Sequence, residues 1–592
     1  MNFPVAVTTS KEHSSRPSRD LLLIDGSAPF FTPFVNGQRK NWSKAPLDAL
    51  IHNGKINDHH SDQICAALTT YCKKVRTLGF TAITFDDLAH LVILDSYSDY
   101  LKKTVHSCRI LLRRCFAIAT AAKLRVFINT DLMFWNRYLE EAAGARLGRD
   151  GRVRQIFAHS LDQLLTTFPE VSGVVTRIGE ADGHDVASPF KSRMWITSAR
   201  QCNRWLKESL PVCEKHNRLL IFRTWSLGAF PIGDISWNEA TEKIAFAGIR
   251  SDALVVSRKF GAADFFRYLP LNERIPASGH AQIIELQARR EYEGFGIFPA
   301  YVGRQYEEYR EQLSTCSTLR GILVWCQSGG WSHFDRLTFL DNSSPWNELN
   351  TRAAIELFTT TRPAATILRQ FCRERFSEQD AEIMIEIVEI FDRLVDRLWY
   401  FAPFARRQIW FRRLRVPPLL WIFWDTILVN QPLRLMFRTY LNSPAEIRND
   451  DREERQLIRR LRLLIKQLSV EQEDLTLGVD TLRLLYSLRR FYLGKAGKKR
   501  IIKISARIER YRNKYPQGFI IESDYSPFRI RWITAGVLFA LLMRSNPDYR
   551  ILDRTLLIRL TGLAFPLLQR FQQQRIPELA DRQAGGLDLF FR

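Results

Sequence analysis

Residues 253–259, Ala-Leu-Val-Val-Ser-Arg-Lys, and residues 282–287, Gln-Ile-Ile-Glu-Leu-Gln, are two short apolar runs that decide the predicted fold. Their length and β-branched content are typical of buried strands. Each run leads directly into charged and aromatic residues, at 258–267 after the first and at 287–294 after the second. Parallel α/β proteins assemble their sites at the carboxyl ends of the strands. A site is therefore expected where these two strands end.

The same pattern recurs on both sides of this stretch. A β-rich run ends in polar or acidic residues, a segment with helical period follows, and the next run comes after roughly 30 to 50 residues. We predict strands at 31–38, 81–87, 125–131, 173–180, 219–226, 253–259, 282–287 and 321–327. Eight such units predict a (β/α)8 TIM barrel. An open doubly wound sheet is disfavoured, because no glycine-rich phosphate loop follows the first strand.

Beyond about Thr360 the pattern changes. No β-rich run of this kind returns, and apolar residues recur at helical spacing, as in Leu457, Leu461, Leu464 and Leu468. Prolines divide this part into several helices, which excludes one long coiled coil. The predicted organisation is a flexible tail over residues 1–19, a barrel over 20–360 and an all-helical basic domain over 361–592. The predicted fold class is therefore an α/β barrel followed by an all-α domain.

Composition limits the function classes. The chain has 592 residues, 46% of them hydrophobic, which excludes the disordered class. Its net charge of +23 indicates an anionic partner. The first twenty residues lack the apolar core of a secretory signal, and no apolar run approaches the ~20 residues that a bilayer span needs, so a cytoplasmic location is predicted. Nine cysteines without a Cys-x-x-Cys pair predict reduced buried thiols, and no metal or cofactor is predicted.

Charged and aromatic residues stand at corresponding points of successive units. A single glutamate after a strand is more often a salt-bridge partner, so the concentration of such residues is the informative feature. Glycoside hydrolysis requires two carboxyl groups across the scissile bond, polar groups that orient hydroxyls, and aromatic platforms for sugar faces. Phosphoryl transfer would require a phosphate loop and metal hydrolysis a histidine cluster, and neither is evident. The strand-end residues are Asp86, Asp87, Asp131, Arg177, Glu180, Arg223, Trp225, Lys259, Asp264, Glu285, Gln287, Glu291 and Trp325.

Short motifs in this set resemble one enzyme family. Glu285-Leu-Gln followed by Glu291-Tyr-x-Gly294 resembles the ELQ…EYxG segment of the glycoside hydrolase family 67 α-glucuronidases. Lys259 with Asp264 and the following Phe resembles that family's strand that carries a Lys and, five residues on, a catalytic Asp.

Two further segments extend the resemblance. The stretch around Glu180 resembles the family's general-acid segment, although Thr176 stands where the family has a Lys. Arg223, between Phe and Thr, resembles the Arg of that family that binds the substrate carboxylate. The family's N-terminal β-domain has no room in this chain.

The resemblance implies an inverting glycosidase. Glu180 would be the general acid, and Asp264 and Glu291 are candidates for activating water, with carboxylates ~6.5–9.5 Å apart in such sites. Lys259 and Arg290 are expected to keep one of these two carboxylates ionised. The family also has a helical C-terminal domain used in dimer contacts, so a homodimer through the helical domain is a possible assembly.

The leading interpretation is a glycosidase that acts on an α-linked uronic acid or a related acidic glycoside. Its substrate would be an acidic carbohydrate, contacted by cations, polar groups and aromatic platforms. Arg223 and Lys259 are expected to grip the substrate carboxylate together, because two neighbouring cations repel each other unless an anion lies between them. The expected substrate-binding residues are Arg177, Arg223, Trp225, Lys259, Asp87, Asp131, Glu285, Gln287 and Trp325.

A second interpretation comes from another class: a non-catalytic barrel whose basic helical domain binds an acidic glycan, a lipid surface or nucleic acid. It depends on residues 406–415, where five arginines interleave with Trp410 and Phe411. An amphipathic helix whose arginine stems cover neighbouring helices is the preferred interpretation of this run. Peripheral membrane contact and nucleic acid binding are therefore not favoured. Another basic run, at 495–503, fits either a phosphate-binding loop or a solvated loop.

Overall fold

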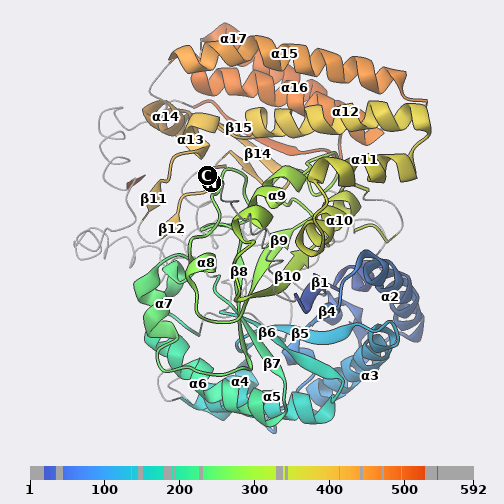
Figure 1. The fold of residues 1–592 in the computed structure, drawn as a ribbon, viewed down its shortest axis with the longest axis vertical. Helices are drawn as coiled ribbons and strands as arrows, with labels where there is room; N and C mark the ends of the chain where they lie inside the picture. The colour runs from blue at the N-terminus through green and yellow to red at the C-terminus, as the bar shows by residue number, and fades with distance from the viewer. Residues whose placement is uncertain are drawn as a thin grey trace, which may run out of the picture.

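Eight parallel strands form a closed barrel in the order β1-β10-β9-β8-β7-β6-β5-β4 (Figure 1). The computed structural model describes residues 19–34, 45–134, 136–144, 151–178, 189–190, 195–225, 231–327, 338–340, 345–411, 414–419, 421–440, 444–469, 473–494, 497–526 and 543–544. The barrel strands are β1 (Leu21–Asp25), β4 (Ala82–Asp86), β5 (Arg125–Asp131), β6 (Val171–Arg177), β7 (Leu219–Arg223), β8 (Leu254–Lys259), β9 (Gln282–Gln287) and β10 (Leu319–Trp325). Nearly all of their residues are buried, as expected for parallel strands that are covered on both faces. The predicted fold class is confirmed.

Helices surround the barrel in the ring seen in Figure 1. Asn57 and Ser98 cap the starts of α2 and α3 with their side-chain oxygens, and Gly79 ends α2 with a φ of 105° that favours glycine. The main helices are α2 (Asp58–Leu78), α3 (Asp99–Ala121), α5 (Arg152–Thr167), α6 (Ala199–Lys215), α7 (Glu239–Ala245), α9 (Gly303–Gln312) and α10 (Pro345–Thr359). Shorter elements are α1 (Leu47–Leu50), β2 (Ile51–His52), β3 (Lys55–Ile56), α4 (Arg137–Ala143) and α8 (Arg274–Ala277), with 3-10 turns at Ala28–Phe31, Leu88–His90 and Pro231–Asp234.

One predicted strand was wrong. The first barrel strand is Leu21–Asp25, whereas the predicted strand at 31–38 begins at the last residue of a 3-10 turn, Ala28–Phe31. Residues 35–38 lie outside the described residues. Pro29 and Pro33 explain the difference, because proline cannot donate to a strand ladder. The apolar run at 21–24 lies inside the predicted barrel region but was not predicted to be a strand. The other seven predicted strands overlap the observed ones.

The C-terminal region is helical, as predicted, but not only helical. Its helices are α11 (Ala364–Arg375), α12 (Glu378–Leu394) with a π-turn at Val395–Trp399, α13 (Ala402–Ala405), α14 (Gln431–Tyr440), α15 (Pro444–Gln467), α16 (Glu473–Leu493) and α17 (Lys498–Lys514). Two small sheets, β12-β11-β16 and β13-β14-β15, accompany them. The strands are β11 (Trp410–Phe411), β12 (Leu414–Arg415), β13 (Ile422–Phe423), β14 (Thr426–Asn430), β15 (Ile520–Asp524) and β16 (Met543–Arg544).

The arginine-rich run at 406–415 was predicted to be helical, and this is wrong for its described residues. It contains β11 and β12, which pair antiparallel. Trp410 is buried, with its ring centroid 4.3 Å from that of Trp237 in the barrel. Arg415 is buried too, and burial lowers the pKa of its guanidinium to about 10. These two side chains therefore pack inside the protein.

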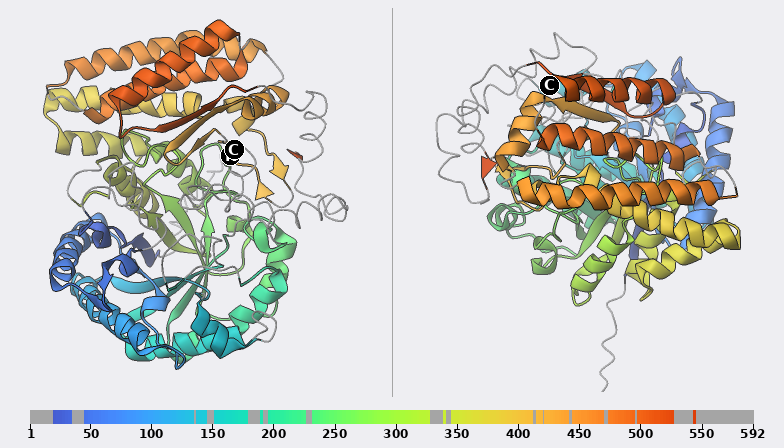
Figure 2. Two further views of the ribbon diagram at one scale, coloured as in Figure 1. Left: turned by 180° about the vertical axis from the view of Figure 1, so that it is seen from behind. Right: turned by 90° about the horizontal axis from the view of Figure 1, so that it is seen from above.

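The helical region packs on one side of the barrel, beyond α9 and α10 (Figure 1 and Figure 2). Phe298 of the barrel side lies 5.7 Å from Phe391 and 5.3 Å from Trp399 by ring centroids. A Cβ added to Gly478 on α16 would come within 2.9 Å of Phe298 and Phe391, so the glycine allows this close approach. All nine cysteines are buried and free of disulfides. None of the helices in the described ranges is long and apolar enough to cross a bilayer.

Candidate active site

Glu285, on β9, lies at the base of the candidate site. Arg223 at the end of β7 donates to it twice, from Nε at 2.9 Å and from Nη2 at 2.7 Å. The Ser257 hydroxyl donates at 2.8 Å and the Trp325 indole at 3.0 Å. Burial alone would raise the pKa of Glu285, but Arg223 and the other donors hold it below its usual range. Glu285 is therefore an ionised, fully bonded carboxylate.

Asp264 lies in the loop after β8, five residues beyond the end of that strand. The Lys259 ammonium is 2.6 Å from its Oδ1, and the Tyr292 hydroxyl donates to its Oδ2 at 2.8 Å. Lys259 also lies 3.6 Å from the centroid of the Trp225 ring, a cation–π contact. Among three strand-end carboxylates, the Asp264 side chain is 18% exposed, against 1% for Glu285 and 2% for Glu291. Asp264 is thus the carboxylate of the three that solvent can reach.

Tyr292 is held by the helical region. The indole of Trp399 donates to the Tyr292 carbonyl oxygen at 2.8 Å. The Tyr292 ring stacks on Phe266 with centroids 4.2 Å apart and lies 6.3 Å from the ring of Trp424. The hydroxyl that bonds Asp264 therefore has a position set from both regions of the protein.

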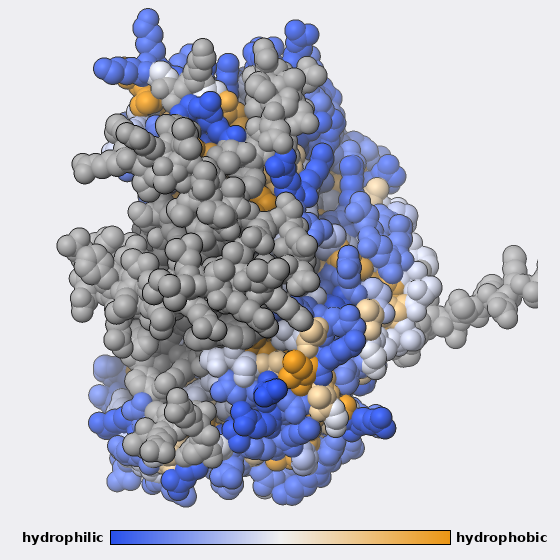
Figure 3. Space-filling view, turned by 90° about the vertical axis from the view of Figure 1, so that its left-hand side faces the viewer, coloured by the Kyte–Doolittle hydropathy of each residue, from blue (hydrophilic) through white to orange (hydrophobic). Residues whose placement is uncertain are grey.

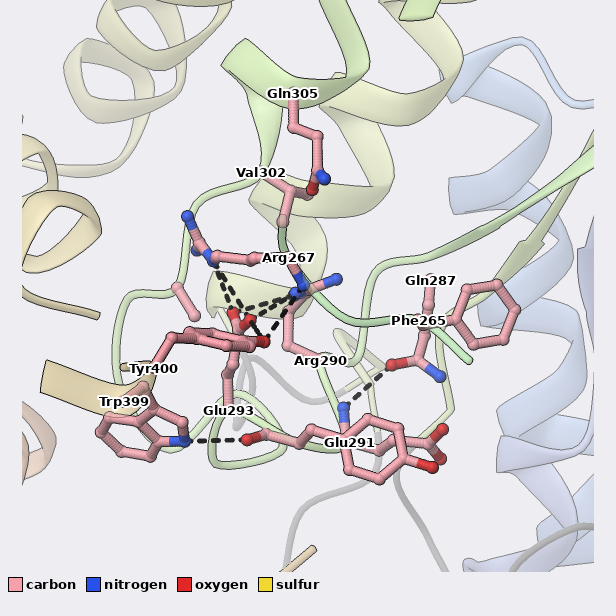
Figure 4. Close-up of polar contacts among 12 residues, drawn as sticks. Phe265, Arg267, Gln287, Arg290, Glu291, Glu293, Val302, Gln305, Trp399 and Tyr400 are labelled. Atoms are coloured by element: carbon pink, nitrogen blue, oxygen red, sulfur yellow. Dashed lines mark hydrogen bonds and ion pairs between the residues drawn. The ribbon is translucent and has the colours of Figure 1, made fainter. Parts of the chain in front are cut away.

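Glu291 lies in the turn that follows β9 (Figure 4). Its backbone N–H donates to the side-chain oxygen of Gln287 at 2.9 Å, and Arg289 donates to its carboxylate at 2.7 Å. Burial lowers the pKa of Arg289, but the carboxylates of Glu291, Asp25 and Asp264 together raise it above its usual value. The Arg289 guanidinium therefore lies near three carboxylates and interacts electrostatically with both Glu291 and Asp264.

A second group of charges lies at the ends of β4, β5 and β6. Arg177 pairs with Asp131, with 2.9 Å between Nε and Oδ1. Burial and the nearby Asp87 raise the pKa of Asp86 to about 6, although Arg177 and a hydrogen bond from Asn129 oppose the shift. Such a value allows Asp86 to hold a proton near neutral pH.

Asp87 belongs to a separate ion pair with His90, whose Nδ1 lies 2.6 Å from Oδ1. Burial opposes the charge on His90, but Asp48 and Asp87 raise its pKa to about 10. Within the described ranges, no three histidine, cysteine or acidic side chains are arranged to hold a metal ion.

Comparisons with known proteins give a fold and no family. No family model matches the sequence, and no curated protein matches it. Among solved structures, a GH138 enzyme targeting pectin rhamnogalacturonan II aligns with a TM-score of 0.51 at 10% identity over 85% of this chain. The match spans 62% of the GH138 enzyme, less than two thirds of its chain. CpGH84B aligns with a TM-score of 0.38 at 9% identity, over 84% of this chain and 74% of its own.

The barrel has a glycosidase-like fold. Within it, direct contacts join six of the predicted site residues in two groups of three, and Glu291 with Gln287 forms a further pair. One group is Arg223, Glu285 and Trp325, and the other is Lys259, Asp264 and Trp225. Lys259 and Glu285 are register partners on β8 and β9, which places the two groups side by side. Arg177 with Asp131 and Asp87 with His90 form the separate pairs described above. Glu180 lies outside the described residues.

Two expectations need correction. Arg223 and Lys259 were expected to need a substrate anion between them, but Glu285 and Asp264 already pair with them. Arg290 was expected to help keep a site carboxylate ionised, yet it pairs with Glu293 on the far side of the turn (Figure 4). The φ of 49° at Arg290 accounts for its different direction, since the chain leaves the extended conformation there.

The sequence analysis missed four contributors to the glycosidase-like site. Asp25, Ser257, Arg289 and Tyr292 were not proposed as site residues. Asp25 had a signal: it follows four apolar residues, precedes Gly26, and ends β1. Tyr292 stands within the quoted motif and Arg289 in the gap between its two parts, but nothing in the local pattern showed which way their side chains point.

Proposed function

We propose that this chain is an inverting glycoside hydrolase that acts on an α-linked uronic acid or a related acidic glycoside. The observation that supports it best is Asp264, a solvent-accessible carboxylate at a strand end, bonded by Lys259 and Tyr292. The motif resemblance to the family 67 α-glucuronidases agrees with this substrate class. So does the structurally similar GH138 enzyme, whose target is a pectin. A cytoplasmic location and a homodimer through the helical region stay predictions.

In this proposal Asp264 is the general base. Its two oxygens receive donors from Lys259 and Tyr292, which stabilise its negative charge and fix its orientation. A water molecule beside the exposed part of the carboxylate would lose its proton to Asp264 as it attacks the anomeric carbon. Glu291 is more deeply buried and is bonded to Arg289, so it is the second candidate for this role.

The substrate carboxylate needs donors that the protein carboxylates leave available. Glu285 accepts from Nε and Nη2 of Arg223, and within the described part of the chain no bond engages Nη1. Lys259 has three N–H groups, of which Asp264 takes one. The Arg223 guanidinium also lies 4.6 Å from the Trp325 ring, an aromatic surface suited to a sugar face. Arg223 and Lys259 together can therefore bind a uronic acid carboxylate.

This role of Arg223 predicts the effect of a double substitution. Arg223→Gln combined with Glu285→Gln removes both charges, so no lone charge stays buried at the base of the site. We expect the kcat/KM ratio of an aryl uronide to its neutral counterpart to fall about tenfold or more, because a hydrogen bond to a charged group contributes about 1.5–3 kcal/mol. An unchanged ratio in steady-state assays would show that Arg223 does not bind the carboxylate of the substrate.

Glu180 is the proposed general acid, as the motif resemblance implies. A glycosidic oxygen is a poor leaving group unless an acid protonates it, whereas an activated phenol leaves unaided. We expect Glu180→Gln to lose about 10²–10⁴-fold in kcat on alkyl uronides and much less on nitrophenyl uronides. Rates across a series of leaving groups measure this. Equal losses across the series would exclude Glu180 as the acid.

The proposed function is tested by a hydrolysis panel of aryl uronides and neutral aryl glycosides. We expect turnover of α-linked uronides and little turnover of neutral sugars. Proton NMR of the first product should show the β-anomer, as inversion requires. A full-length protein that hydrolyses none of these compounds would contradict the proposal, and a first product with the α-configuration would contradict the inverting mechanism.

A further inference from the structure

Helix α17 carries a stripe of cations on its exposed side. Lys499, Lys503, Arg507, Arg510 and Lys514 are all exposed and follow one another at spacings of three or four residues. At 3.6 residues per turn these spacings place all five within an arc of about 80°. The neighbouring flank, with Ile504, Ile508 and Tyr511, is buried. Residues 498–514 include eight Lys or Arg residues and one Glu.

Helix α16 adds cations beside this stripe. It packs against both α15 and α17, and the three helices lie side by side when the molecule is seen from above (Figure 2). Burial lowers the pKa of Arg507, and the positive charges of Arg483, Arg510 and Arg490 lower it further. The guanidinium groups of Arg483, Arg490 and Arg510 are therefore close enough to Arg507 to repel it. We name the side chains of Lys499, Lys503, Arg507, Arg510, Arg483 and Arg490 the α16–α17 face.

Two acidic residues accompany these cations. Asp480 pairs with Arg483 at 2.9 Å and with Lys514 at 2.7 Å, and Glu509 is the acid on α17 itself. They leave an excess of positive charge on the face. Among the residues that Figure 3 colours at the upper end of the molecule, hydrophilic ones lie at the surface together with a few apolar ones. Such a surface favours an anionic partner.

The buried flank of α17 disfavours a lipid surface as the anionic partner. A helix that lies on a lipid surface inserts an apolar face, but the apolar flank of α17 is buried, and Ile502 is the one large apolar side chain on its described length that is exposed. The barrel is proposed to act on an acidic glycoside, and a uronic acid polymer carries one carboxylate per sugar. Such a polymer is therefore the anionic partner that both the barrel and the cations of α17 can bind.

We propose that the α16–α17 face docks an acidic polysaccharide while the barrel acts on a uronide of the same polymer. This inference rests on the proposed function for its choice of ligand. The helical region is in close contact with the barrel, because Gly478 of α16 packs on Phe298 at the edge of the barrel. Docking would raise the local concentration of chain ends at the barrel.

The test measures binding separately from hydrolysis. Polygalacturonate binding is compared at several salt concentrations for the wild type, for Lys499→Gln/Lys503→Gln/Arg510→Gln, and for a matched control, Lys73→Gln/Lys103→Gln/Lys207→Gln. The control removes three exposed charges from α2, α3 and α6. We expect the α17 variant to bind about tenfold more weakly at physiological salt with a smaller salt dependence, and the control to bind like the wild type. Wild-type affinity in the α17 variant would overturn the proposal.

Further measurements separate this proposal from the proposed function. The α17 variant should keep the wild-type kcat/KM on a small aryl uronide and lose it only on the polymer. If the wild type binds polygalacturonate through α17 but hydrolyses no uronide, the docking proposal stands and the hydrolase proposal fails. Tighter binding to duplex DNA or to phosphatidylserine vesicles than to polygalacturonate would overturn the choice of a polysaccharide.

Discussion

Replacing Asp264 with Asn is expected to lower the kcat for an aryl uronide by about 10³-fold, within the range of general-base catalysis. Asn keeps the shape of the side chain and can still accept from Lys259, but its amide cannot take a proton from water. The loss should be similar for good and poor leaving groups, because attack by water is impaired in both. Steady-state kinetics on two aryl uronides of different leaving-group pKa measure this.

Two further variants test the assignment. Tyr292→Phe removes one hydrogen bond to Asp264 and keeps the stacked ring, so we expect a smaller loss, about tenfold. Asp162→Asn removes a surface carboxylate that pairs with Lys215 and should leave the rate unchanged. If Asp264→Asn keeps more than a tenth of the activity while Glu291→Gln loses far more, Glu291 is the base and Asp264 a positioning residue.

The barrel could be predicted from local patterns because each of its strands is a short apolar run. Seven of the eight runs had polar ends and helical neighbours that mark a βα unit. The first strand was missed for a local reason as well: the run at 21–24 borders a polar tail, and the strand was predicted at 31–38 instead, a segment that contains Pro33. For the seven correct strands and for the missed one, the sequence features that decided the prediction lay within about ten residues of the strand.

The pairing of charges in the site could not be predicted in the same way. Arg223 and Glu285 are 62 positions apart and stand on β7 and β9, with β8 between them. Alternate strands contribute to the same layer inside a barrel, so such a pair forms only once the register of three strands is set. The types of residue at the site were therefore predictable, but their partners were not.

The strands of the C-terminal region were missed for a related reason. Thr426–Asn430 pairs in parallel with Ile520–Asp524, almost a hundred residues later. Strands of two to five residues leave little periodic signal, and a parallel partner so far away leaves none nearby. Helical periods dominate the sequence between them, so this region was predicted to be all-helical.

Replacing Glu293 with Ala is expected to lower the free energy of unfolding by about 3–5 kcal/mol, because it leaves the buried Arg290 without its counter-charge and leaves Asp392 as the ion-pair partner of Arg267. Glu293 is fully buried and accepts from Arg267 at 3.0 Å, from Arg290 at 3.1 Å and from the Tyr400 hydroxyl at 2.6 Å (Figure 4). Tyr400 belongs to the C-terminal region, so this carboxylate joins that region to the barrel. Urea denaturation of the full-length protein measures the change.

The pH dependence follows from the same contacts. Burial opposes the charge on Glu293, but Arg267 and Arg290 lower its pKa from 4.5 to about 2. A carboxyl whose pKa is lower in the folded state contributes stability that is complete above its unfolded pKa and is lost as the pH falls toward its folded pKa. The stability difference between the wild type and Glu293→Gln should therefore be constant above about pH 5 and shrink between pH 4.5 and 2.

Glu386 provides the matched control for burial. It also accepts two hydrogen bonds from one arginine, Arg460, each at 2.7 Å, but its side chain is 41% exposed. Exposed ion pairs contribute about 0–1 kcal/mol, so Glu386→Ala should change the unfolding free energy by no more than that. If Glu293→Ala and Glu386→Ala cost the same, burial of the Glu293 carboxylate does not determine its contribution. The junction between barrel and helical region would then depend on its apolar contacts, such as Phe298 with Phe391 and Trp399.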